Sequence, residues 1–267
     1  SAAANAQHAD PELRMESRFR AAELYDMLGW TAAALGAYEQ LRTDFPDSDY
    51  ARRADYGYAW ALYHSGKYTD ATTAAEAFLH KQPESPHAPG LEYLRGNCLH
   101  QMKQYSEALA VYNRLREKYP ESPFVGQALY KSAWAYYLMG DTVAARDAAR
   151  AFLDGYPDNS LAGEAGYLLG LVHVASGDYE EALKEFRFAV ASFPDSEFSA
   201  DALFKSAECH AQLGLRDEAA RAFEEFAKQY PDNPLAEQAM LRSGDARFTA
   251  RDFVEALAQY ERILEAP

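Results

Sequence analysis

Two cysteines and two of the histidines are the side chains of this sequence with the clearest capacity for redox or metal chemistry. Cys98 and Cys209 lie 111 residues apart, His173 and His210 lie 37 residues apart, and Cys209 directly precedes His210. Zinc sites usually take their ligands in closely spaced pairs, so this spacing favours packing over metal binding. Because 111 is three times 37, the cysteines should occupy equivalent positions in a repeating structure, beyond the limit of about 7 Å between bridged Cα atoms. We therefore expect no metal, no disulfide and two buried free thiols.

The sequence patterns of common catalytic sites are absent as well. There is no Gly-x-x-x-x-Gly-Lys loop for phosphate, no His-Glu-x-x-His pair for zinc and no Gly-x-Ser-x-Gly turn for a nucleophilic serine. Acidic residues are plentiful, but they recur at every repeat junction, whereas a catalytic pair would normally occur once. We expect a protein that is not an enzyme and that uses no cofactor.

Charge and hydropathy exclude two classes of partner. The formal net charge is −15, whereas affinity for a phosphate backbone comes mainly from Lys and Arg. Nucleic acid is therefore not an expected partner. No apolar run approaches the length of about 18 residues that a spanning helix needs, so no transmembrane segment is expected.

A period of 37 residues organises the elements that must position all these side chains. Prolines recur at this spacing: Pro46, Pro83, Pro120, Pro157, Pro194 and Pro231. Each is followed by an acidic residue and then by Ser or Asn, which accept hydrogen bonds from the free N–H groups at a helix start. A small residue follows 13 positions after the proline, and a turn follows at 20 positions, with Gly in most repeats and Lys103 or Arg251 in two. Each repeat should thus contain two helices, of about 17 and about 13 residues.

The repeats divide nearly the whole chain. Residues 1–8 are expected to form a disordered leader. Residues 9–267 are expected to form a single array of seven units, namely 9–45, 46–82, 83–119, 120–156, 157–193, 194–230 and 231–267. Neither helix of a unit buries its apolar face alone, so stacked units should share one continuous core.

One repeat shows a family resemblance with particular clarity. Gly177, Tyr179, Ala182, Phe186 and Pro194 follow the pattern of the tetratricopeptide repeat (TPR). The resemblance implies an all-α fold, a right-handed α-α superhelix whose inner face is lined by the first helix of each unit. The usual unit has 34 residues, and the three additional residues are expected to extend the start of the first helix.

A narrower resemblance suggests a cellular setting. Long repeats with a Tyr-Pro-Asp/Glu-Ser junction resemble those of bacterial envelope proteins, namely the TolA-binding coordinator and the outer-membrane assembly lipoproteins. This resemblance implies a periplasmic or cell-envelope location, with the cytoplasm as the alternative.

The resemblance to the TPR family also implies which residues face a partner. The inner face should use positions ten, fourteen and seventeen after each proline, and seven after it in later repeats. The aromatic candidates are Tyr56, Trp60, Tyr63, Tyr93, Tyr130, Trp134, Tyr137, Tyr167 and Phe204. Aromatics recur at the tenth position, which favours packing between units there, whereas the other positions vary and include large rings typical of binding hot spots. Some TPR grooves bind a C-terminal carboxylate with a clamp of Lys and Asn. The position that matches the clamp's Lys carries Tyr, Phe or Leu in this sequence, so a C-terminal carboxylate is not an expected ligand.

Acidic candidates follow in the later repeats: Glu164, Asp201, Glu208 and Asp245. They predict a groove that is aromatic in its first half and acidic in its second, suited to a peptide with apolar anchors and basic residues; the alternative is a solvated face. The preferred function is a binding scaffold for a protein or peptide. A non-catalytic arm of a larger multidomain enzyme and self-association through the terminal repeats are the alternatives.

Overall fold

The structure, a computed structural model, describes residues 10–264, and all regular elements within this range are α-helices. The predicted leader at residues 1–8 and the ends of the first and last units lie outside the described residues. The helices are α2 (Pro11–Met27), α3 (Thr31–Asp44), α4 (Asp49–His64), α5 (Tyr68–Lys81), α6 (Ala88–Gln101), α7 (Tyr105–Lys118), α8 (Phe124–Leu138), α9 (Thr142–Gly155), α10 (Ala162–Ala175), α11 (Tyr179–Ser192), α12 (Ser199–Gln212), α13 (Arg216–Gln229), α14 (Ala236–Thr249) and α15 (Phe253–Leu264).

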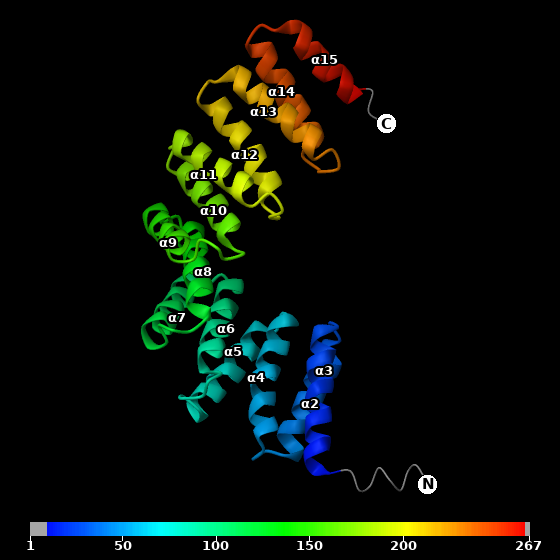
Figure 1. The fold of residues 1–267 in the computed structure, drawn as a ribbon, viewed down its shortest axis with the longest axis vertical. Helices are drawn as coiled ribbons and strands as arrows, with labels where there is room; N and C mark the ends of the chain where they lie inside the picture. The colour runs from blue at the N-terminus through cyan, green and yellow to red at the C-terminus, as the bar shows by residue number, and fades with distance from the viewer. Residues whose placement is uncertain (1–9, 265–267) are drawn as a thin grey trace, which may run out of the picture. The chain divides into compact units, whose positions relative to one another are not determined.

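The chain forms two compact bodies. The N-terminal body extends to Ala128 and the C-terminal body begins at Leu129, so α8 runs through the division. Within the run from α2 to α7 and within the run from α9 to α15, each helix packs against the next one in sequence, and alternate helices such as α2 and α4 or α10 and α12 also touch (Figure 1). The fourteen helices of residues 10–264 thus pack sequentially in pairs, which confirms the predicted all-α repeat fold.

The turn inside each repeat confirms the sequence alignment. Gly29, Gly66, Gly140, Gly177 and Gly214 all have positive φ, between 72° and 80°. Lys103 and Arg251, which replace glycine in two repeats, take the same left-handed conformation with φ of 61° and 65°. This conformation ends a helix and is costly for residues with a Cβ atom. The repeat therefore imposes its turn geometry even where glycine is absent.

The junction between repeats differs from the sequence prediction. In four repeats the three additional residues do not extend the first helix, because α6, α10, α12 and α14 begin five residues after their prolines and have 14 residues each. The predicted length of about 17 residues is reached by α2, with 17, and approached by α4, with 16. The Ser or Asn after the proline closes a tight turn instead, as where Asn159 Oδ1 accepts from the Leu161 amide at 2.9 Å. Only Ser48 acts as predicted, since its hydroxyl accepts from the Ala51 amide at the start of α4. Local side-chain hydrogen bonds to the backbone compete with helix here.

In three repeats a glycine of the first helix packs against a large ring of the second. A Cβ atom added at Gly96, Gly170 or Gly244 would lie 2.3 to 2.5 Å from the ring of Tyr112, Phe186 or Tyr260, respectively. In two other repeats the equivalent pairs are Ala59 with Ala75 and Ala133 with Ala149, all buried. A ring on the second helix thus fills the space that a glycine leaves on the first, and this keeps the core dense.

The cysteines are core residues. Cys98 on α6 and Cys209 on α12 are both free and buried, as predicted. Burial raises the pKa of each thiol to about 11. In residues 10–264, no helix combines the length and the apolar character needed to cross a membrane.

Candidate functional site

The aromatics at the tenth position of each repeat belong mainly to the core. Tyr93, Tyr130, Tyr167 and Phe204 are at most 9% exposed. Tyr167, for example, stacks on Phe198 with ring centroids 5.1 Å apart. These rings hold neighbouring helices together, which agrees with the packing interpretation of this position. Tyr56 differs, because it is only partly buried.

Two Trp–Tyr pairs share one geometry. Trp60 and Tyr63 lie on α4 with ring centroids 5.9 Å apart and planes at 81°, and Trp134 and Tyr137 on α8 repeat this with 5.9 Å and 83°. All four rings are partly buried. Edge-to-face pairs of this kind are favourable and rigid. They are suited to contacting a partner with little loss of side-chain freedom.

A cleft in the N-terminal body uses part of this aromatic surface. It has a volume of about 590 Å³ and lies between α2 and α4. Phe19, Tyr38, Tyr56 and Trp60 contribute its rings, and the guanidinium of Arg53 lies 4.1 Å from the centroid of Phe19. We call it the N-terminal cleft.

The rim of the N-terminal cleft carries apolar and acidic side chains. Leu24 and Met27 on α2 are 57% and 82% exposed. Asp26 accepts a hydrogen bond from His64 at 3.1 Å, whereas Glu23 makes no ion pair with any described residue. An apolar floor with a free carboxylate at its edge suits an apolar side chain that has a basic neighbour.

Three of the four predicted acidic residues already have partners in the chain. Glu164 accepts a hydrogen bond from Tyr130 at 2.5 Å, and Glu208 pairs with Lys205 at 2.8 Å. Asp245 accepts from the Tyr260 hydroxyl at 3.1 Å. Three of the predicted acidic side chains are therefore engaged within the chain, and Glu208 is the one among them whose charge is balanced by a cation.

Sequence reasoning missed a set of cations at the eleventh position after the proline. Lys131, Lys205 and Arg242 occupy it in three repeats. Burial lowers the pKa of Lys131, which neighbouring Glu164 partly offsets. Their recurrence next to the acidic positions was the available signal.

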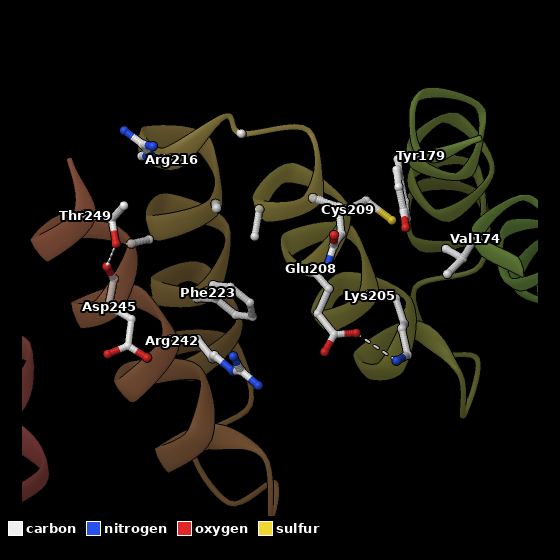
Figure 2. A pocket seen from close by; sticks show the side chains of 15 residues that line it. Val174, Tyr179, Lys205, Glu208, Cys209, Arg216, Phe223, Arg242, Asp245 and Thr249 are labelled. Atoms are coloured by element: carbon white, nitrogen blue, oxygen red, sulfur yellow. Dashed lines mark hydrogen bonds and ion pairs between the residues drawn. The ribbon is translucent and has the colours of Figure 1, made fainter. Parts of the chain in front are cut away.

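The last two of these cations line a cleft in the C-terminal body, which we call the C-terminal cleft. Its volume is about 480 Å³, and it is lined by residues of α12 and α14 with the buried ring of Phe223 from α13 (Figure 2). Glu208 and Asp245 also line it, so two of the predicted site residues come together here. Trp134, Tyr137 and Asp201 line neither cleft.

The histidines do not form a metal centre. His173 on α10 is buried, with Nδ1 3.9 Å from Asp178, and burial lowers the pKa of His210 on α12. Within residues 10–264, no group of three His, Cys, Asp or Glu side chains is placed to hold a metal ion.

Comparison with known families gives two matches. A family model described as "Outer membrane lipoprotein" (YfiO) matches residues 28–104 and 97–217. A tetratricopeptide repeat model matches residues 211–267. These matches confirm the predicted resemblance. The search of curated sequences found no match.

Solved structures support the fold. The C-terminal part of a TPR repeat-containing protein from Cytophaga hutchinsonii is 17% identical, with a TM-score of 0.75 over 92% of this chain and 94% of that one. PilW, a type IV pilus biogenesis factor, is 15% identical, with a TM-score of 0.69 over 87% of this chain and 100% of that one. YrrB, a TPR protein with an unusual peptide-binding site, is 24% identical, with a TM-score of 0.56 over 72% and 92%.

Proposed function

Because the chain belongs to the YfiO family of outer membrane lipoproteins, we propose that it is a non-catalytic scaffold that binds a protein or peptide in bacterial cell-envelope assembly. Its location in this proposal is the periplasmic side of the envelope. The division of residues 9–267 into seven stacked units is part of the same proposal. YrrB, a similar fold with a peptide-binding site, shows that such repeats are compatible with this role.

The observation that carries the proposal is the N-terminal cleft. Trp60 and Tyr56 are partly buried at its wall, and Leu24 and Met27 are exposed at its rim. Large exposed apolar side chains beside a concave aromatic surface are typical of protein interfaces. The occupant is a segment with an apolar anchor for this cleft and a basic residue for Glu23.

Exposed apolar residues near the end of the chain support the alternative of self-association. Phe253, Val254, Leu257 and Leu264 on α15 are all more than half exposed. In the preceding repeat, the positions equivalent to Leu257 and Leu264 are Ala220, which is buried, and Ala227, which is partly buried, and α14 packs against this helix. A further repeat, another domain of a larger protein or a second copy would bury this face. Light scattering over a concentration series distinguishes the second copy from the others.

Site-specific photo-crosslinking in the parent bacterium tests the scaffold function. A photoreactive amino acid at Leu24 should capture a partner protein, and the captured segment should contain an apolar residue near Lys or Arg. Met27→Glu places a charge at the rim of the cleft and should abolish capture. Since Met27 is 82% exposed, this change should leave the fold intact.

Val143→Glu is the matched control, because Val143 is 59% exposed on α9, outside the cleft. It should leave capture unchanged. Trp60→Ala, checked for helix content by circular dichroism, should also abolish capture. Equal capture by the parent chain, Met27→Glu and Trp60→Ala would exclude the N-terminal cleft as the binding site.

A further inference from the structure

The C-terminal cleft contains a cation that the rest of the chain leaves unpaired. Arg242 on α14 is exposed and makes no ion pair or hydrogen bond with residues 10–264. The chain has 41 acidic and 26 basic residues, so carboxylates outnumber cations. Arg242 nevertheless has no carboxylate partner in the cleft. Such a group is available to an external anion.

The other charged groups of this cleft are engaged, apart from Arg216 at the start of α13, which also makes no ion pair with residues 10–264 and points away from Phe223 in Figure 2. Lys205 and Glu208 on α12 form an ion pair at 2.8 Å. Asp245 accepts from Tyr260 on α15 at 3.1 Å, and Figure 2 shows its carboxylate pointing away from Arg242. Arg242 extends from α14 towards the side on which α12 lies (Figure 2). It is therefore the unpaired charge that the cleft offers beside its apolar floor.

The surroundings of Arg242 define the shape of that ligand. The ring of Phe223 is 2% exposed, and Cys209 is likewise buried, so the floor is apolar. A guanidinium presents a planar pair of donors that matches a carboxylate with two parallel hydrogen bonds. Glu208 and Gln212 on α12 also line the cleft and carry oxygen atoms that can accept from main-chain N–H groups.

We propose that the C-terminal cleft binds an internal acidic residue of an extended peptide segment, with the Asp or Glu carboxylate on Arg242 and an adjacent aliphatic side chain against Phe223. This occupant is opposite in charge to the basic segment expected from the acidic residues in the sequence. The reason is that Glu164, Glu208 and Asp245 have partners within the chain, whereas Arg242 does not. The inference rests on the scaffold function, but it concerns a different body of the protein.

Selection from a displayed library of random peptides of about a dozen residues tests the proposal. The peptides are fused through their C-termini to the display protein, so no free C-terminal carboxylate is present. The full chain should enrich sequences with Asp or Glu next to Leu, Ile or Val. The best peptide, made synthetically with an amidated C-terminus, should bind Arg242→Gln about ten- to a hundredfold more weakly, because a charge-assisted hydrogen bond is lost.

Charge reversal gives a readout that a purely structural role would not change. A second selection on Arg242→Glu should enrich Lys or Arg in place of the acid. Arg262→Gln is the control, because Arg262 is exposed on α15 outside the cleft; it should bind the selected peptide like the parent chain.

Three results would overturn the proposal: no enriched peptide, enrichment without acidic residues, or unchanged affinity in Arg242→Gln. Loss of crosslinking in Met27→Glu together with any of these results would retain the scaffold function and reject the C-terminal cleft as an acidic-peptide site. Loss of peptide binding in Arg242→Gln with unchanged crosslinking in Met27→Glu would retain the C-terminal cleft as an acidic-peptide site and reject the N-terminal cleft as a binding site of the scaffold.

Discussion

Adding one methyl group at Gly170 should destabilise the protein, although alanine is the better helix former. A Cβ atom at Gly170 would lie 2.4 Å from Cε1 and 2.5 Å from Cδ1 of Phe186, whereas carbon atoms in contact prefer about 3.5 to 4.0 Å. Phe186 is fully buried and also packs on Tyr167, with ring centroids 5.8 Å apart. The ring therefore has to move by roughly 1 Å into occupied space.

Two opposing magnitudes decide the outcome. Replacing glycine by alanine inside a helix gains about 0.5–1 kcal/mol, and overpacking a dense core costs about 1–3 kcal/mol. We expect Gly170→Ala to lower the free energy of unfolding by about 1–2 kcal/mol. Gly36→Ala on α3 is the matched control, because nothing lies within 4 Å of its added Cβ; it should raise that free energy by about 0.5–1 kcal/mol.

Urea unfolding followed by circular dichroism measures both changes, and a double-mutant cycle identifies the cause. In a Phe186→Ala background, which mimics the Ala133–Ala149 pair, the effect of Gly170→Ala should reverse sign and become stabilising. Gly170→Ala as stable as the parent chain would refute the steric argument. A loss of the same size in the Phe186→Ala background would show that the ring is not the cause.

Three further predictions follow from single contacts. Lys103→Gly should raise the free energy of unfolding by about 0.5–1 kcal/mol in urea titrations, because Lys103 has a φ of 61° that glycine adopts without cost; a decrease would contradict the turn geometry. Tyr112→Phe should lower the free energy of unfolding by about 1–3 kcal/mol, because the buried side-chain carbonyl of Asn97 loses the hydrogen bond that the Tyr112 hydroxyl donates at 2.8 Å. Adding Asn97→Leu to this variant should recover part of the loss. Burial raises the thiol pKa of Cys98 and Cys209 to about 11. Both thiols should therefore react with a thiol reagent at pH 8 about a hundredfold more slowly in the folded than in the unfolded protein. Rapid labelling of the folded chain would contradict their burial.

The binding surfaces were only partly predictable. Trp60 and Tyr56 were identified from their positions in the repeat, and the structure places both at the wall of the N-terminal cleft. Arg242 was not identified, because a cation in a sequence carries no sign of whether a neighbouring helix will neutralise it. The acids illustrate the same limit: Glu208 and Asp245 were predicted as free charges, but Lys205 and Tyr260 engage them.

The sequence by itself determined the repeat, its two helices and its turn. Those features depend on local chemistry, so the spacing of the prolines and glycines was sufficient, and even Lys103 could be assigned its turn from alignment alone. The start of the first helix was mispredicted in most repeats, although it too depends on a local contact, such as the hydrogen bond that Asn159 accepts in the turn before α10. Tertiary structure decided that Tyr130 and Tyr167 are core residues while Met27 and Arg242 remain exposed. Burial and charge pairing depend on which helices become neighbours, and a one-dimensional period does not contain that information.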